Sequence, residues 1–249
     1  MASVNWFDRG GGAYAQFRPD YPPELAEALA GLAPRRDLAV DVGCGSGQLT
    51  AQLGDHFAQV VGLDPSEAQI ANARPHPRLR YRVAPAEALP LADGMADLIT
   101  AAQAAHWFDR LAFYAEARRI AAPGAAIALI SYGVMAIADA ALNARFLRFY
   151  HDEIGPFWPP ERKLVDGGYA GIGFPFSPLP APALSITRDW DLAAFMGYLS
   201  TWSATRSARE AGHGAVLTRF AAEFAPLWGD PARVRRVDWP IAMRLGRLE

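Results

Sequence analysis

Residues 40–49 of this 249-residue chain read VDVGCGSGQL, a stretch in which an apolar strand passes into a helix through three alternating glycines, Gly43, Gly45 and Gly47. Glycine has no Cβ, so a glycine backbone can approach a ligand closely. A helix that begins near Ser46 would also present unsatisfied N–H groups at its positive end. The stretch therefore predicts a cofactor-binding loop between a strand and a helix.

The spacing of the glycines bears on which cofactor this loop binds. A dinucleotide fingerprint has the order G-x-G-x-x-G, whose third glycine allows close packing of helix on strand, and Gln48 stands in that third place. Asp41 would repel the pyrophosphate of a dinucleotide, whereas it would attract the sulfonium and ammonium groups of S-adenosylmethionine. The loop favours S-adenosylmethionine, although its glycine spacing alone is only moderately specific.

Asp64 ends a second short apolar run, residues 59–64. A carboxylate at this place, roughly 20 residues beyond the glycine loop, can bind the two hydroxyls of a ribose in nucleoside-binding α/β folds. Asp64 can also be the N-cap of the following helix, with Pro65 at its first position. The two roles are compatible, and the ribose contact does not separate NAD from S-adenosylmethionine.

Further segments before and after these two complete a characteristic order along the chain. Together they resemble the class I, Rossmann-like S-adenosylmethionine-dependent methyltransferases, and most of all the trans-aconitate methyltransferase-like, type 11 group that acts on small molecules. The resemblance spans nearly the whole chain and is weakest over residues 135–185. It is carried by the glycine loop and by residues 17–22 (FRPDYP), 62–64 (GLD), 86–90 (AEALP), 102–109 (AQAAHWFD), 123–124 (PG) and 201–204 (TWSA).

Composition limits the setting and the partners of the chain. Hydrophobic residues make up 51% of the sequence and the formal net charge is −2, which argues against disorder and against a basic field for nucleic acid. The single cysteine, Cys44, and an N-terminus without a basic start and apolar run predict a reduced, cytoplasmic location. The uncharged run 120–138 is interrupted at Pro123 and Gly124, so we expect a buried strand there and no membrane partner. Oligomeric state is left open.

Alternating apolar runs and helical patterns predict an α/β fold, doubly wound around a mostly parallel sheet. Resemblance to the family implies seven strands, an antiparallel last strand and an inserted helical cap. We expect one domain over 1–249: an N-terminal lid and helix (1–34), a donor-binding core (35–134), an acceptor-binding cap (135–210), and a return to the core by helix 213–227 and strand 234–245 (211–249). The other expected strands are 38–42, 59–63, 79–83, 97–101 and 125–132, and the other expected helices are 22–32, 46–57, 66–73 and 109–121.

Resemblance to the family also assigns donor-binding residues, and these lie mainly at the carboxyl ends of the expected strands. Pro85 departs from the family pattern, because it offers no side-chain acceptor and no N–H for adenine. Glu87 therefore either contacts adenine, caps a helix or faces solvent. The predicted donor-binding set is Tyr14, Arg18, Asp41, Gly43, Cys44, Gly45, Asp64, Pro65, Ala86, Glu87 and Gln103.

Two residues are candidates for the chemistry itself. Arg18 offers a planar fork for a carboxylate of donor or acceptor, or else forms a surface salt bridge. His106 has a titratable imidazole beside the expected acceptor pocket, or else packs the start of the following helix. Trp107 and Trp202 are candidates for acceptor contact, although cap aromatics commonly serve packing.

The sequence predicts a methyltransferase with a small-molecule acceptor. A carboxylate acceptor, which the resemblance suggests, is already ionised near neutral pH and needs no base, whereas a phenol, amine or alcohol would make His106 a plausible base. No His, Asp or Cys cluster has metal-ligand spacing, so we expect no metal. Two alternatives remain: a same-fold enzyme that cyclises or cleaves S-adenosylmethionine, and a non-catalytic protein that binds it.

Overall fold

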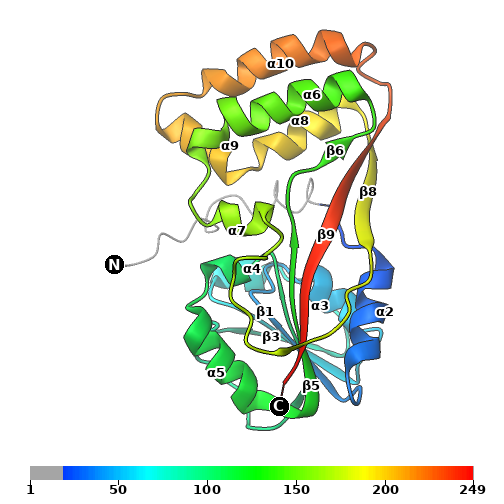
Figure 1. The fold of residues 1–249 in the computed structure, drawn as a ribbon, viewed down its shortest axis with the longest axis vertical. Coiled ribbons are helices and arrows are strands. Elements are labelled where there is room, and N and C mark those ends of the chain that lie inside the picture. Colours follow the sequence, from blue (N-terminus) through cyan, green and yellow to red (C-terminus); the bar gives the residue numbers. More distant parts are fainter. Residues whose placement is uncertain (1–18, 249) are drawn as a thin grey trace.

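Apolar runs of the sequence form the strands of one sheet in the computed structural model, which describes residues 19–248 (Figure 1). Antiparallel strands later in the chain extend the same sheet. The strands are β1 (Leu38–Val42), β2 (Gln59–Asp64), β3 (Leu79–Val83), β4 (Ala96–Ala102), β5 (Ala121–Tyr132), β6 (Ala136–Ile137), β7 (Ser177–Pro178), β8 (Leu184–Trp190) and β9 (Arg235–Arg247).

Helices occupy the connections between the strands and form a separate group at one end of the molecule (Figure 1). They are α2 (Pro23–Leu32), α3 (Gln48–Leu53), α4 (Glu67–Ala71), α5 (Arg110–Ile120), α6 (Ala140–Arg148), α7 (Arg162–Asp166), α8 (Leu192–Ser200), α9 (Ser203–Glu210) and α10 (Ala215–Trp228). Short turns of other helix types are η1 (Ala105–Trp107), η2 (Phe149–Glu153) and η3 (Gly155–Phe157).

The sheet has the order β3-β2-β1-β4-β5-β9-β6, and β7 and β8 also pair with β9. The pairs among β1 to β5 are parallel, and β9 runs antiparallel to β5. The main path therefore contains seven strands and a reversed strand after β5. This confirms the predicted α/β class with a mostly parallel, Rossmann-like sheet.

Strand β5 shows how the sheet is covered on both faces. Ala128 and Ile130 pack in the same cluster as α2 and α3, whereas Ile127 and Leu129 pack in the cluster that contains α5. Both faces are therefore buried from Ala125 onward, which is why residues 125–130 of this strand are apolar without interruption. Helix α5 begins at a good capping residue, because the Asp109 carboxylate accepts hydrogen bonds from the N–H groups of the first turn.

A group of helices, α6 and α8 to α10 with the turns η2 and η3, lies beyond the sheet where the cap is expected, and we call this group the cap. Its membership differs from the expected range 135–210. Helix α10 packs against α6, α8 and α9, where the Phe220 ring stacks on Phe149 and the Phe224 ring on Phe195. The expectation that helix 213–227 returns to the core is therefore wrong. Its amphipathic pattern required a buried face, and the cap aromatics provide it.

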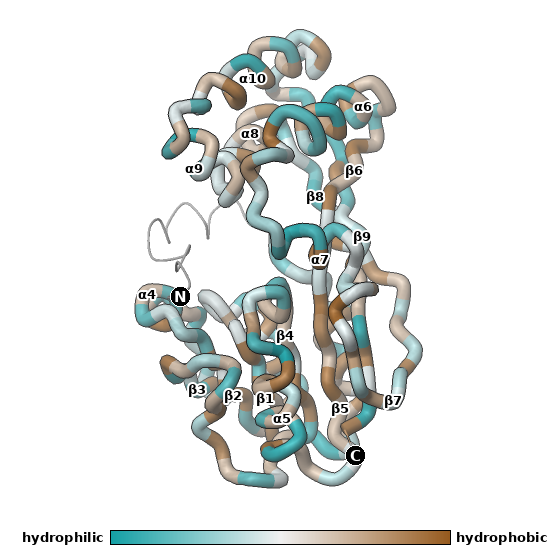
Figure 2. Tube along the Cα trace, turned by 60° about the vertical axis from the view of Figure 1, so that its left-hand side comes forward, coloured by the Kyte–Doolittle hydropathy of each residue, from teal (hydrophilic) through white to brown (hydrophobic). Residues whose placement is uncertain are grey.

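The stretch 135–210 is also more than a cap, because part of it joins the sheet. Strand β8 pairs along its whole length with β9, from Leu184 opposite Ile241 to Trp190 opposite Arg235. In Figures 1 and 2, α7 lies between the cap helices and the sheet. The long strands β5, β8 and β9 connect the two parts.

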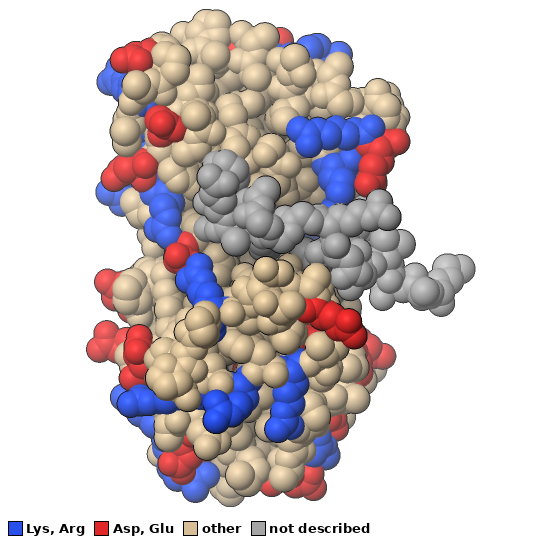
Figure 3. Space-filling view, turned by 180° about the vertical axis from the view of Figure 1, so that it is seen from behind, with Lys and Arg blue, Asp and Glu red and all other residues tan. Residues whose placement is uncertain are grey.

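The described surface carries both signs of charge. On the face in Figure 3, the Lys and Arg side chains are interspersed with Asp and Glu. Within residues 19–248, no helix is both long enough and apolar enough to cross a membrane.

Candidate active site

The glycine loop turns sharply between β1 and α3. Gly43, Gly45 and Gly47 have φ values of 70°, 54° and 81°, a left-handed conformation that favours glycine. The N–H groups of Gly43 and Cys44 both donate to the Leu63 carbonyl, at 2.7 and 3.0 Å. The loop is thereby tied to the end of β2, and the left-handed Gly47 delays the start of α3 to Gln48.

Two of these glycines leave no room for a side chain. A Cβ on Gly43 would collide with the Cβ of Ala104, and a Cβ on Gly47 would collide with the Tyr81 hydroxyl. A Cβ on Gly45 would have only the Gln69 side chain in reach, at 4.0 Å. Gly43 and Gly47 therefore serve close packing within the protein, and the middle glycine has open space beside it.

Asp64 connects the glycine loop to the start of α4. Its Oδ2 accepts a hydrogen bond from the Gly45 N–H at 2.8 Å and its Oδ1 accepts one from the Ser66 N–H at 2.9 Å. The Ser66 side chain, in turn, caps α4 by accepting from the Gln69 N–H. The alternative of Asp64 as N-cap, with Pro65 first in the helix, is therefore wrong. Each carboxylate oxygen of Asp64 keeps a second lone pair for a hydroxyl.

Asp41 lies inside the sheet. Its side chain is 1% exposed, and its two oxygens accept hydrogen bonds from the hydroxyls of Thr50 at 2.7 Å and Thr100 at 2.8 Å. Burial raises the pKa of Asp41 to about 6. Asp41 thus supports the loop from within, and its burial does not favour the predicted direct contact with a donor.

Cys44 is not a reactive thiol. Burial and the nearby carboxylates of Asp41 and Asp64 raise the pKa of the Cys44 thiol far above its usual range. The thiolate is the nucleophilic form of cysteine. The Cys44 thiol therefore stays protonated, and a contribution of Cys44 through its backbone remains a prediction.

Gln103, which follows β4, has a φ of 54°. A left-handed conformation is uncommon for a residue with a side chain, and such strain concentrates at functional sites. Two hydrogen bonds hold it: the Gln103 N–H donates to the Ile130 carbonyl at 2.8 Å, and Nε2 donates to the Tyr132 carbonyl at 2.7 Å. The Gln103 side chain is thereby fixed at the carboxyl ends of β4 and β5.

His106 lies on η1, three positions after Gln103. Its Nδ1 is 2.9 Å from the Tyr169 hydroxyl. Burial and the positive charge of Arg162 lower the pKa of His106 to about 3. The imidazole is therefore neutral near pH 7. Trp107 packs its ring 4.8 Å from the imidazole and remains 36% exposed.

Tyr169, the partner of His106, is also in a left-handed conformation, with a φ of 59°. Its N–H donates to the Leu164 carbonyl at 2.8 Å, which turns the chain back after α7. Within the described residues, Gln103 and Tyr169 are the two non-glycine residues with positive φ. Tyr169 contacts His106 directly, and Gln103 precedes His106 by three positions in the chain.

Glu87 and Ala86 follow β3. One Glu87 carboxylate oxygen accepts a hydrogen bond from the Asp109 N–H at 2.8 Å, so Glu87 ties this segment to the start of α5. This matches the helix-capping alternative and leaves adenine contact a prediction. Ala86 is 5% exposed, and Pro65 is exposed.

Trp202 lies in the aromatic core of the cap. It is 5% exposed, and its ring centroid is 5.1 Å from that of Trp158 and 5.6 Å from that of Tyr150. These contacts indicate that Trp202 serves packing. Trp158 and Tyr150 in turn contact Arg162, a residue of α7. Tyr14 and Arg18 lie outside the described residues.

Arg162 was not predicted from the sequence. It begins α7, and its Nε donates to the Tyr150 hydroxyl and to Asp166 Oδ1, both at 2.9 Å. Helix α7 contacts both η1 and β5. The i,i+4 spacing of Arg162 and Asp166 in the sequence indicates an ion pair on a helix, but it does not indicate that His106 is a neighbour.

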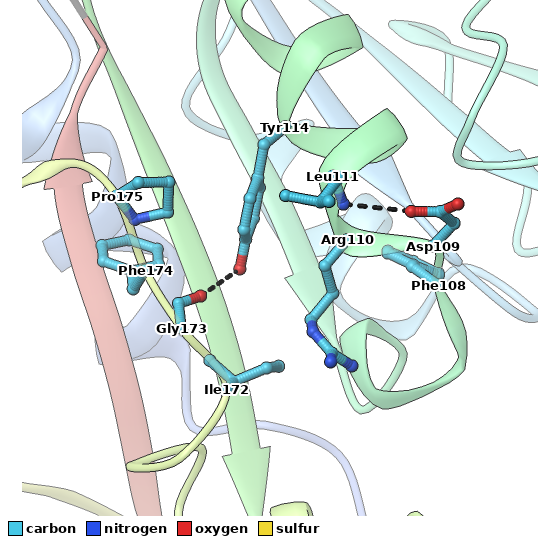
Figure 4. Close-up of a pocket in the computed structure, with 9 residues that line it drawn as sticks. All are labelled: Phe108, Asp109, Arg110, Leu111, Tyr114, Ile172, Gly173, Phe174 and Pro175. Atoms are coloured by element: carbon cyan, nitrogen blue, oxygen red, sulfur yellow. Dashed lines mark hydrogen bonds between the residues drawn. The ribbon is translucent and has the colours of Figure 1, made fainter.

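A surface pocket of about 610 Å³ lies between the start of α5 and residues 172–175 (Figure 4). It is lined by residues 108–111, Tyr114 and residues 172–175, and the Tyr114 hydroxyl closes one side by donating to the Gly173 carbonyl at 2.8 Å. None of the predicted site residues lines this pocket. Among residues 19–248, no three His, Cys, Asp or Glu side chains are grouped as metal ligands.

Comparison with known proteins shows similarity along the whole chain. A family model of the methyltransferase domain matches residues 40–129. A Dictyostelium discoideum protein named as a methyltransferase is 35% identical over 246 residues, which are 95% of this chain and 92% of the relative. A solved structure from Anaeromyxobacter dehalogenans, described as a type II methyltransferase, is 46% identical with a TM-score of 0.87, and the match covers 93% of this chain and 98% of that one.

A shorter match concerns about half of the chain. The trans-aconitate 2-methyltransferase of Methylobacterium radiotolerans is 36% identical over 123 residues, which are 47% of this chain and 46% of that protein. The two full-length matches include the cap, whereas this one covers about half of each chain.

Proposed function

Because this chain belongs to the class I S-adenosylmethionine-dependent methyltransferases, we propose that it methylates a carboxylate of a small acceptor molecule to form a methyl ester. The donor, S-adenosylmethionine, supplies an electrophilic methyl group on a sulfonium. The enzyme must align an acceptor oxygen with the S–CH3 bond and exclude water, since positioning provides most of the acceleration in such a displacement.

The glycine loop and Asp64 fit this donor. The glycines allow the loop backbone to approach the donor closely, and the space beside Gly45 is open. The Asp64 carboxylate keeps lone pairs for the two ribose hydroxyls. Gln103, held in a strained conformation at the end of β4, is suited to orient the methionine part. Asp41 acts through Thr50 and Thr100 by keeping the loop in shape.

The observation that carries the choice of a carboxylate is the state of His106. A phenol, amine or alcohol acceptor needs a base that takes up its proton. His106 is the titratable residue that the sequence offers there, but its Nδ1 is engaged by Tyr169, and burial together with Arg162 lowers its pKa to about 3. A neutral, weakly basic imidazole suits an acceptor that is already ionised, such as a carboxylate.

The test is product analysis with purified protein, S-adenosylmethionine and a panel of small carboxylic acids that includes trans-aconitate. We expect S-adenosylhomocysteine in equal amount to an alkali-labile methyl ester. Methylthioadenosine formed without an acceptor would instead indicate attack within the donor, and binding of the donor without any product would indicate a non-catalytic protein.

His106→Gln separates the acceptor classes. Loss of a general base costs about 10²–10⁴-fold in rate, so we expect a far smaller loss here if the acceptor is a carboxylate. A loss of that full size, together with a bell-shaped pH profile in the wild-type protein, would favour a protonated acceptor.

A further inference from the structure

Arg162 is held in one position by contacts on three sides. Its Nε donates to Tyr150 and Asp166, its guanidinium carbon lies 4.7 Å from the centre of the Trp158 ring, and its side chain is 19% exposed. A guanidinium that is fixed in this way loses little further freedom when it binds a ligand.

Helix α7 brings this guanidinium to the carboxyl ends of the central strands. A Cβ on Gly133, directly after β5, would lie 3.3 Å from the Asp166 Cα, so the helix is pressed onto the end of β5. The chain then turns so that the Tyr169 hydroxyl reaches His106. Burial and the charge of Arg162 lower the pKa of His106, and the same charge opposes the rise in pKa that burial gives Tyr169. Arg162 therefore lies near both side chains.

Two side chains in this region have donor groups with no acceptor among residues 19–248. Both hydrogen bonds that Arg162 makes within residues 19–248 use Nε, so its two terminal nitrogens make none there. The neighbouring Trp158 has a buried Nε1 with no acceptor among the described residues. A carboxylate offers two oxygens and about four lone pairs, and pairs with a guanidinium fork in a bidentate manner.

We propose that Arg162 is the anchor of the acceptor subsite, where its terminal nitrogens bind a carboxylate of the acceptor between α7 and η1, with the Trp158 ring beside the guanidinium. This inference rests on the proposed function for the identity of the acceptor. It also assigns a role to α7: the helix carries the cation that selects an anionic substrate.

The inference is tested by calorimetric binding of trans-aconitate, citrate, malonate and benzoate to the full chain saturated with S-adenosylhomocysteine. For the acid that binds the wild-type protein most tightly, Arg162→Gln should weaken binding at least tenfold, and Arg162→Lys, which keeps the charge but loses the fork, should weaken it less. The matched control is Lys163→Gln, which removes an exposed charge from the next position of α7 and should leave affinity within twofold.

Asp166→Asn distinguishes an anion anchor from a structural ion pair. Asp166 competes for the guanidinium, so its neutral amide should strengthen carboxylate binding if Arg162 is the anchor. If the Arg162–Asp166 pair only holds α7 in place, the same change should weaken binding, and that result would overturn the inference. S-adenosylhomocysteine affinity and the unfolding temperature of each variant report whether the fold is intact.

The inference and the proposed function fail separately. If no acid binds the wild-type protein, or if Arg162→Gln binds the acids as well as wild type does, Arg162 is not the anchor even where a methyl ester forms. If the acids bind through Arg162 but no ester appears, the anchor stands and ester formation is wrong.

Discussion

A single carboxylate, that of Asp64, organises the proposed ribose site, because it holds both the glycine loop and the start of α4. Asp64→Asn keeps the shape of the side chain but replaces a charged acceptor. We expect S-adenosylmethionine binding to weaken by about 1–3 kcal/mol, the usual value of hydrogen bonds to a charged group, as measured by calorimetry. Asp152→Asn, an exposed carboxylate on the cap, is the control. An unchanged dissociation constant would remove Asp64 from the site.

Asp41 should make stability depend on pH in an unusual direction. Burial raises its pKa from 3.8 to about 6, so between these values the folded state holds a proton that the unfolded state has lost. The contribution of Asp41 to stability is therefore present below about pH 4 and is lost as the pH rises through 6. A shift of about two units, at about 1.36 kcal/mol each, amounts to about 3 kcal/mol.

Asp41→Asn removes this dependence. In urea unfolding at pH 4, 5.5 and 7, the stability of the variant relative to wild type should rise by up to about 3 kcal/mol over the series, because other titrating groups are common to both proteins. If the difference in stability between the variant and wild type stays constant with pH, burial does not raise the pKa of Asp41.

Among the elements, the glycine loop can be tested by comparing Gly43, which lies in it, with Gly94, which lies elsewhere. Both have a φ of 70°, but a Cβ on Gly43 collides with Ala104 while a Cβ on Gly94 meets nothing within 4 Å. Gly43→Ala should therefore lower the free energy of unfolding by about 1–3 kcal/mol more than Gly94→Ala, the usual cost of overpacking. Gly43→Ala should also weaken donor binding.

Both substitutions carry the same backbone strain, so the difference between their free energies of unfolding measures the collision of the new Cβ with Ala104. Chemical denaturation gives the free energies, and calorimetry gives the donor affinity. Equal losses in the two variants would show that Ala104 moves aside without cost.

In the cap, Trp202 tests whether aromatic residues there serve packing or recognition. Trp202→Ala should cost about 3–5 kcal/mol of stability, as for other buried aromatic residues, and Trp107→Ala should cost less, because that side chain is 36% exposed. Thermal and urea unfolding provide the measurement. If Trp202→Ala leaves stability unchanged and only raises the acceptor KM, the residue belongs to the binding surface.

Elements with a strong local pattern were predictable from the sequence. The buried parallel strands are apolar on both faces, and the glycine loop marks its own place between strand and helix. Helix ends were less accurate: the expected helix 46–57 forms only from Gln48 to Leu53. Gly47, at a φ of 81°, sets the later start, and Gly54 is the C-cap at the earlier end.

At the scale of the whole molecule, long-range neighbours were not predictable. The amphipathic pattern of α10 shows that one face is buried but does not show whether the core or the cap buries it. Arg162 is similar: its local pair with Asp166 is readable, whereas its place beside His106 depends on how the cap folds back over the sheet. The donor loop is local in sequence, so it was found; the proposed acceptor subsite is assembled from distant segments, so it was not.

Strand β9 pairs with β5 and β6 on one side and with β7 and β8 on the other. These pairs join residues that are far apart in sequence, such as Ala126 and Arg247. During synthesis, residues 235–247 leave the ribosome after all four of these partners. The edges of these four strands that face β9 stay unpaired until residues 235–247 have been synthesised, and pairing between segments so distant in sequence is slow to form. Until then β5 exposes an unpaired apolar edge that can join another chain, so the period before β9 arrives is when the nascent protein is most exposed to aggregation.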